Sequence, residues 1–203
     1  MSLPKVTIII PYKVDRGYLR RAIESVSEQT YKGEIELILS QSEGSVSYNL
    51  NRGIEKSTGD YIKYLCDDDW LPPNSIEDSV FTLSGADFIH GNAINVFGDR
   101  RQLQKPRKER PTLNDMLNNN VIHGGTLMYR KEVFEKVGLF DESLDCAEEY
   151  EFNLRCLKHG LKLKYCNKTL YNYRRHDKQK SLGKGIDQTV RQKKIQAIKD
   201  KFK

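Results

Sequence analysis

The chain has 203 residues, of which 37% are hydrophobic and 31% are charged, and its formal net charge is +6. A chain of this length and composition predicts one folded domain, or one domain with a small appendage. No apolar run approaches the roughly 18 residues that a membrane span needs. The basic balance permits an anionic partner, but no nucleic-acid-binding signature is present, and we expect no nucleic acid partner.

The four cysteines, Cys66, Cys146, Cys156 and Cys166, have neither the CxxC spacing nor the histidine partners of a zinc site. Residues 1–15 lack the pattern of a signal peptide. We therefore expect free thiols in a reducing, cytoplasmic compartment. Two basic segments, residues 100–110 and 178–203, leave open a peripheral contact with a membrane surface.

The first third of the chain alternates strand and helix patterns. The β-branched run Val6–Ile10 predicts a strand buried on both faces, and a helical stripe follows over residues 16–29. A second strand at 35–39, a helix from about 46 to 56 and a third strand at 61–65 complete the series. This alternation predicts right-handed crossovers and a parallel sheet.

The third strand ends in three consecutive acids, Asp67, Asp68 and Asp69, before Pro72. A solvated turn is one interpretation of such a triplet, and a site for a hard divalent cation is the other. Ligands of a parallel sheet bind beyond the carboxyl ends of its strands. Pro11–Tyr12, Ser42–Glu43 and the acidic triplet all lie at such ends, so we expect them to line one crevice.

The second half has shorter elements. Strands are predicted at 86–90, 93–97, 124–129, 161–165 and 170–174, and helices at 113–117, 131–137, 148–158 and 185–202. The charged segment 98–111 reads as a surface loop or as a flap that meets an acceptor. Glu148, Glu149 and Glu151 open the helix at 148–158, where acids also complement the helix dipole. His176 follows the last strand as a surface histidine or a neutral ligand.

Several segments in this order resemble the GT-A-fold glycosyltransferases of family 2, an inverting group that uses nucleotide-sugar donors. The resemblance covers about residues 4–181. Its segments are residues 7–11, 22–31, 51–54 and 59–72 in the first half, and residues 124–130, 132–142 and 147–151 in the second.

The resemblance implies an α/β fold of the GT-A type, with a central mixed, mostly parallel sheet flanked by helices. It implies a single domain over residues 1–182, with a nucleotide-sugar half at 4–90 and an acceptor half at 91–182. A basic helix at 183–203 follows, with further domains after it as one possibility.

The resemblance also implies the residues of the donor site. Asp69 is the expected ligand of Mn²⁺ or Mg²⁺, and His176 completes the coordination. Asp67 or Asp68 contacts the ribose or the waters of the metal. The remaining expected donor contacts are Pro11, Tyr12, Glu43 and Asn51. Cys66 replaces the first acid of the family motif. Glu43 lies in a nucleotide-binding segment that departs from the family pattern. Uridine is the first expectation for the base, followed by thymidine and guanosine.

By the same resemblance Glu149 is the catalytic base, with Glu148 and Glu151 as rivals. The implied reaction is metal-dependent, inverting transfer of a sugar from a nucleotide-sugar, UDP first, to a hydroxyl of a glycan, glycoprotein or lipid. A catalytically degenerate domain that binds nucleotide or glycan is the alternative. A sugar-phosphate nucleotidyltransferase is disfavoured, because residues 11–17 hold a single glycine where that class has a glycine-rich loop.

Overall fold

The computed structural model describes residues 2–144, 146–177, 179 and 187–202. The predicted alternation is confirmed in β1 (Val6–Tyr12), α1 (Leu19–Ser27), β2 (Ile35–Gln41), α2 (Val46–Lys56) and β3 (Tyr61–Tyr64). β1 lies between β2 and β3 and is parallel to both. The first helix begins three residues later than predicted, because the Asp15 side chain accepts a hydrogen bond from the Gly17 N–H and forms a turn there.

The rest of the described chain contributes the other helices and the other four strands. In order they are α3 (Ser75–Leu83), β4 (Phe88–Phe97), β5 (Arg100–Gln104), α4 (Leu113–Asn118), the 3₁₀ turn η1 (Gly124–Thr126), β6 (Met128–Arg130), α5 (Glu132–Val137), α6 (Glu148–Lys158), β7 (Leu163–Arg174) and α7 (Gln188–Asp200).

The strands form one seven-stranded sheet in the order β2-β1-β3-β6-β4-β5, and β7 pairs in parallel with β4. Within it β5 and β6 run against the other five strands, because both are antiparallel to β4. The expected mixed, mostly parallel sheet is therefore confirmed. β4 and β7 pair with two register shifts near Gly91 and Asn92, so the two strand segments predicted at 161–165 and 170–174 are one bulged strand.

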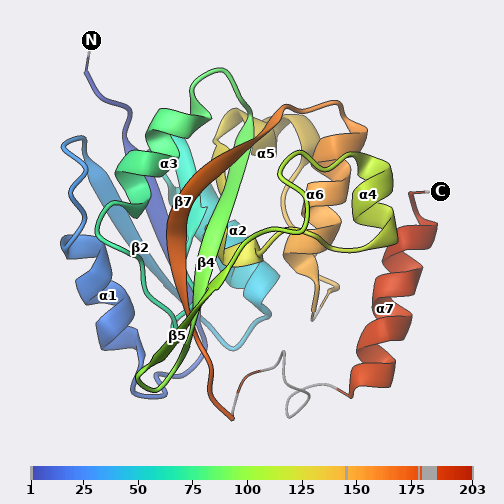
Figure 1. Cartoon of the computed structure of the whole chain (residues 1–203), viewed down its shortest axis with the longest axis horizontal. Coiled ribbons are helices and arrows are strands. Elements are labelled where there is room, and N and C mark those ends of the chain that lie inside the picture. The colour runs from blue at the N-terminus through green and yellow to red at the C-terminus, as the bar shows by residue number, and fades with distance from the viewer. Residues whose placement is uncertain (1, 145, 178, 180–186, 203) are drawn as a thin grey trace.

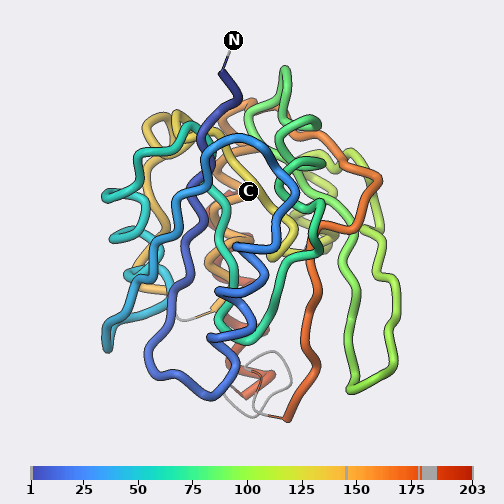
Figure 2. The backbone as a smooth tube through the Cα atoms, turned by 90° about the vertical axis from the view of Figure 1, so that its left-hand side faces the viewer, coloured from blue at the N-terminus to red at the C-terminus, as the bar shows by residue number. Residues whose placement is uncertain are grey.

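Helices cover both faces of the sheet, as Figures 1 and 2 show. One core contains residues of α1 and α3, among them Leu19, Ala22 and Ile76. The other contains residues of α2, α4, α5, α6 and α7, with the ring of Phe152 of α6 stacked on that of Phe134 and tilted against that of Phe140. Among the described residues, no helix has the length and apolar character that a membrane crossing requires.

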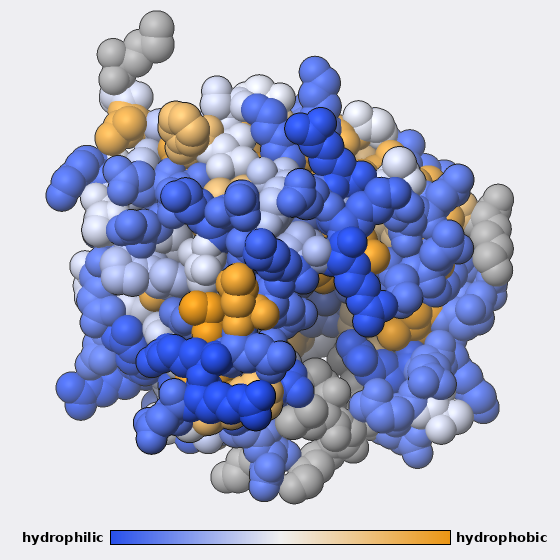
Figure 3. Space-filling view, viewed as in Figure 1, coloured by the Kyte–Doolittle hydropathy of each residue, from blue (hydrophilic) through white to orange (hydrophobic). Residues whose placement is uncertain are grey.

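The segment 98–111 is only partly the loop that was predicted. Residues 100–104 form β5, which pairs with β4 in a hairpin closed by Gly98 and Asp99. Gly98 has a φ of 57°, which suits a two-residue hairpin turn. The five residues of β5 are all exposed, so no hydrophobic alternation marked the strand in the sequence. The hairpin stands at one edge of the molecule in Figure 2, and Figure 3 shows mainly hydrophilic side chains over it.

The C-terminal helix α7 packs on the domain. Ile198 is 1% exposed and belongs to the core that contains α4 and α6, and Lys199 Nζ donates to the Asn118 carbonyl at 3.1 Å. The boundary expected between residues 182 and 183 lies outside the described residues, as does the expected start of this helix. The described part of α7 is therefore an element of the packed body.

We predict that Ile198→Ala lowers the free energy of unfolding by about 2 to 5 kcal/mol, because it removes a buried side chain from the shared core. Denaturant unfolding measures this change. Val190→Ala on the same helix is the control, since Val190 is 44% exposed, and we expect a change within about 0.5 kcal/mol. Equal, small effects of both substitutions would show that α7 does not stabilise the domain.

Candidate functional site

Asp69 is held between the end of β3 and the strand β7. It is 1% exposed, and its two carboxylate oxygens accept hydrogen bonds from the Tyr171 hydroxyl and the Arg174 N–H, each at 2.8 Å. Burial, together with the neighbouring charge of Asp68, raises the pKa of Asp69 well above its ordinary value. Both oxygens therefore already have protein donors, and the side chain ties β7 to the acidic turn.

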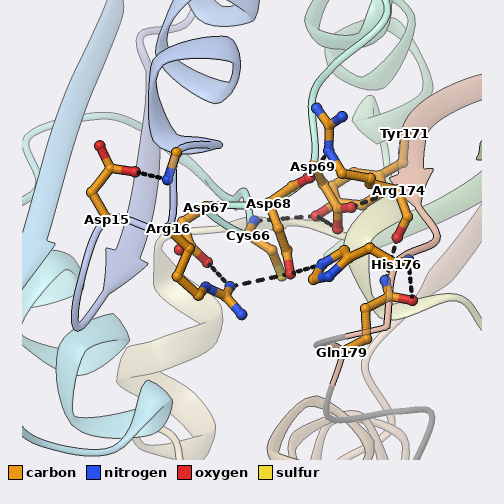
Figure 4. A network of polar contacts seen from close by, with 11 residues as sticks. Asp15, Arg16, Cys66, Asp67, Asp68, Asp69, Tyr171, Arg174, His176 and Gln179 are labelled. Carbon is orange, nitrogen blue, oxygen red and sulfur yellow. Dashed lines mark hydrogen bonds and ion pairs between the residues drawn. The ribbon is translucent and has the colours of Figure 1, made fainter. Parts of the chain in front are cut away.

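The other two acids of the triplet point toward cationic and imidazole groups, as Figure 4 shows. Arg16 Nη2 lies 2.9 Å from Asp67 Oδ1 and 3.2 Å from Asp68 Oδ2. His176 Nε2 lies 3.1 Å from the same Asp68 oxygen. Asp68 is thus the carboxylate on which the loop after β1 and the segment after β7 converge.

The donor atoms at this turn fit a divalent cation. The Cys66 sulfur and one oxygen each of Asp68 and Asp69 lie within 4.8 Å of one another. The two carboxylates are the hard oxygen ligands that Mn²⁺ and Mg²⁺ take, and the imidazole of His176 lies beside them. Burial also raises the pKa of the Cys66 thiol well above its usual value, so this group stays a neutral thiol.

A cavity of about 610 Å³ opens in front of the acidic turn. Its lining comes from the end of β1, the segments that follow β1 and β3, the start of α2, the end of β7, the start of α6 and one residue of α7. Its lining residues are Pro11, Tyr12, Lys13, Val14, Arg16, Gly44, Ser45, Val46, Asn49, Cys66, Asp67, Asp68, Asp69, Cys146, Ala147, Glu148, Glu149, Tyr173, Gln179 and Arg191. Two acidic groups far apart in the sequence, Asp67–Asp69 and Glu148–Glu149, therefore meet in one cavity.

Glu149 lies in the first turn of α6 and is partly buried in this lining. Desolvation, and then the charge of Glu148, raise the pKa of Glu149 to about 7. The preceding residue Ala147 has a φ of 61°, a left-handed conformation that costs energy for a residue with a side chain. Gly124 leaves room for the carboxyl group, since a Cβ there would lie 2.7 Å from Glu149 Cγ.

Glu151, a rival of Glu149 in the sequence, has a structural partner instead. Its carboxylate accepts hydrogen bonds from Arg155 Nε at 2.8 Å and from Arg155 Nη2 at 2.9 Å. The same guanidinium donates to the carbonyls of Val137 and Leu139. Glu151 does not line the cavity. Its ion pair with Arg155 instead helps to join α6 to the end of α5.

The structure brings together most, but not all, of the residues expected at the donor site. Pro11, Tyr12, Asp67, Asp68, Asp69 and Glu149 line the cavity, and His176 adjoins it through Asp68. Glu43 lies outside the lining with its side chain 82% exposed, and it pairs with Lys13 at 2.8 Å.

Asn51, an expected donor contact, is not among the residues that line the cavity. Its amide nitrogen donates to the Phe140 carbonyl at 2.9 Å, and its oxygen accepts from the Phe140 N–H at 3.0 Å. Asn51 therefore joins α2 to the segment after α5. Asn49, on the same helix, lines the cavity instead and bonds to Ser42.

Lys63 is a site-supporting residue that the sequence pattern did not single out. It is fully buried in β3, and its Nζ donates to the carbonyls of Gly125 and Leu127 at 3.1 and 3.2 Å. Burial lowers the pKa of Lys63 to about 7. The side chain thereby holds η1, whose first residue Gly124 packs against Glu149. Arg16 and Arg191, from distant parts of the chain, were likewise not expected in the lining.

Comparison with known proteins identifies the family of the chain. The family described as "Glycosyl transferase family 2" matches residues 34–138, just over half of the chain. The chain belongs to this family. Uncharacterized glycosyltransferases of Rickettsia typhi and Rickettsia prowazekii are each 30% identical to it, over 76% and 73% of the chain respectively. The chain spans only 59% and 57% of the length of these two relatives.

Solved structures of the S. aureus protein TarS share the fold of this family member. One of them, residues 1–349 in complex with UDP-GlcNAc, superposes with a TM-score of 0.70 at 15% identity, over 86% of this chain and 60% of that chain. Another, in complex with UDP, has a TM-score of 0.68 at 16% identity, over 84% of this chain and 60% of that one. The expected GT-A fold is therefore confirmed.

We predict that Glu149→Gln and Glu151→Gln have different effects on stability at pH 8. Glu151→Gln lowers the free energy of unfolding by about 2 kcal/mol, because Arg155 loses its charged partner. Glu149→Gln leaves it unchanged or raises it, because burying a charged Glu149 is unfavourable above its pKa of about 7.

Thermal unfolding at several pH values measures both effects. The Glu149 carboxyl titrates near 4.5 when exposed and near 7 when folded, so the folded state binds more protons between these values. The wild type therefore loses stability relative to Glu149→Gln as the pH rises from about 4.5 to about 7. A difference that is independent of pH would show that Glu149 is not buried as described.

Proposed function

We propose that this family 2 domain catalyses metal-dependent, inverting transfer of a sugar from a nucleotide-sugar to an acceptor hydroxyl. The observation that carries the proposal is the meeting of the β3 acids and Glu149 in one cavity. The first group suits a diphosphate bound with a cation, and the second suits a base. These are the two chemical functions that such a transfer needs.

Glu149 is the proposed base. Its pKa of about 7 keeps the carboxylate available near neutral pH and gives it more affinity for a proton than an exposed glutamate has. In the proposed step the acceptor oxygen bonds to the anomeric carbon, the bond from that carbon to the diphosphate breaks, and the acceptor proton passes to Glu149. Attack from the face opposite the diphosphate inverts the anomeric configuration.

Asp68 and His176 are the proposed ligands of Mn²⁺ or Mg²⁺, with Asp69 beside them. This assignment differs from the expectation for Asp69, because both Asp69 oxygens accept protein hydrogen bonds whereas Asp68 lies against His176. When bound, the cation would neutralise charge on the leaving diphosphate. Arg16 adds a fixed positive charge next to Asp67 and Asp68.

UDP-sugars are the proposed donors. TarS, which shares the fold, has been solved in complexes with UDP and with UDP-GlcNAc. Pro11, Tyr12, Asn49 and Asp67 are the proposed contacts of the nucleoside. The acceptor is proposed to be a hydroxyl of a glycan, glycoprotein or lipid. The four cysteines are free thiols, which supports a cytoplasmic location.

The test of this proposal is incubation with a panel of UDP-sugars, Mn²⁺ and candidate acceptors, with NMR assignment of the product linkage. We expect a β-linkage from an α-linked donor and no product with Glu149→Gln. A product that retains the α-configuration would contradict the inverting mechanism. UDP-sugar binding without any turnover would instead support a catalytically degenerate domain.

We predict that kcat/KM rises about tenfold per pH unit below pH 7 and levels off above it, because only the ionised Glu149 accepts the proton. Initial rates of UDP release from pH 5 to 9 measure this dependence. The Glu149→Gln variant should be about 10² to 10⁴-fold slower with no such rise. A wild-type rate that falls with pH over this range would exclude Glu149 as the base.

We predict that Gly124→Ala lowers kcat and leaves UDP binding unchanged. The new Cβ would lie 2.7 Å from Glu149 Cγ and 2.8 Å from the Tyr64 hydroxyl oxygen, so the base must move. Steady-state kinetics and UDP titration measure the two quantities. Gly160→Ala is a control in which no atom lies within 4 Å of the new Cβ. Its φ of 70° strains an alanine, so this variant tests backbone strain without a contact with the base. Unchanged kcat in Gly124→Ala would show that the position of Glu149 is not critical.

A further inference from the structure

A second cavity has a volume of about 300 Å³. It is formed by residues 104–107, which begin at the last residue of β5, and by residues 119–123 before η1. None of the residues expected at the donor site lines it. Its lining is polar and basic: Lys105 and Arg107 supply two positive charges, and Gln104, Asn119 and Asn120 supply amides. No described carboxylate lines this cavity, in contrast to the acid-rich donor cavity.

The two cations of this cavity are available to a ligand. Within the described part of the chain, neither Lys105 nor Arg107 forms an ion pair, whereas the nearby Lys108 is paired with Asp115 at 2.7 Å. The surrounding segment 98–110 has six basic and two acidic residues. Figure 3 shows this part of the surface as mainly hydrophilic. A cavity of this composition attracts an anion.

His123 connects this cavity with the proposed reaction centre. Its ring lies 5.0 Å from the ring of Tyr173, which lines the donor cavity, and 5.6 Å from the ring of Tyr171. The next residue, Gly124, packs against Glu149. His123 therefore lines the second cavity and also contacts Tyr173, a residue of the donor-cavity lining.

His123 also has an unused polar atom. Its Nδ1 is buried and has no hydrogen-bond partner among the described residues. Burial, with the charges of Lys63 and Arg175, lowers the pKa of His123 to about 4, so the imidazole is neutral near pH 7. A neutral imidazole suits a hydroxyl group, and buried polar atoms without a partner are rare in folded proteins.

We propose that this second cavity is the acceptor subsite and that the acceptor carries a phosphate or a carboxylate group. Lys105 and Arg107 bind the anionic group, and the amides and His123 contact hydroxyl groups of the same molecule. This inference rests on the proposed function for its catalytic meaning. The binding of the anion itself does not depend on catalysis and is tested separately.

The test is an NMR titration of the ¹⁵N-labelled chain with sn-glycerol 3-phosphate, run with and without saturating UDP and Mg²⁺. Glycerol and glucuronate are parallel probes, the first without charge and the second with a carboxylate. We expect the phosphate to shift the backbone amides of Gln104, Lys105, Arg107 and residues 119–123, also when UDP fills the donor cavity. Glycerol should leave them unchanged, and the glucuronate arm separates carboxylate from phosphate recognition.

Two double variants separate this cavity from the general basic surface. Lys105→Gln with Arg107→Gln should raise the Kd for glycerol 3-phosphate at least tenfold. Arg100→Gln with Arg101→Gln removes the same charge from the adjacent β5 strand, outside the lining, and should change the Kd less than threefold. Equal effects of the two pairs, or shifts confined to the donor cavity, would overturn the proposal. If the wild type does not bind UDP, that result would instead argue against the proposed function.

Discussion

The site depends on one buried carboxylate, Asp69. A carboxylate that is removed from water needs hydrogen-bond donors, and here they come from Tyr171 and the Arg174 backbone, both in β7. The Tyr171 hydroxyl in turn accepts a hydrogen bond from the Cys66 N–H at 3.1 Å. The end of β3 is thereby fixed to a strand more than a hundred residues later in the chain, and Asp68 is brought to His176.

The cavity keeps its two acidic groups in different environments. Asp67 and Asp68 both form ion pairs with the guanidinium of Arg16, so they lie in a polar, charged environment that suits a cation and a diphosphate. Glu149 is partly buried next to Glu148. Desolvation, and then the charge of Glu148, raise the pKa of Glu149 to about 7, which suits the transfer of a proton. The division between binding and base therefore follows from burial and from the nearest charges, since all of these groups are carboxylates.

Local patterns in the sequence predicted the elements that position the site. The bounds of α2 and α6 agree with the predicted helices, and the strand ends at Pro11, Tyr12 and Asp67–Asp69 do converge. The contacts that were missed join distant segments. Asn51 forms hydrogen bonds with Phe140, outside the cavity lining, and Arg191 of the basic tail lines the cavity. Neither pairing has a local signature, because each depends on how the second half packs on the first.

The most direct test of the account is calorimetric titration with UDP, with and without Mn²⁺, on the wild type and on Asp68→Asn. The account predicts binding that is strengthened by Mn²⁺ in the wild type, with that strengthening lost in Asp68→Asn while the fold is retained. Metal-dependent binding that is the same in Asp68→Asn, or UDP binding that Mn²⁺ does not affect in the wild type, would contradict the central claim that the end of β3 holds a cation against a nucleotide diphosphate.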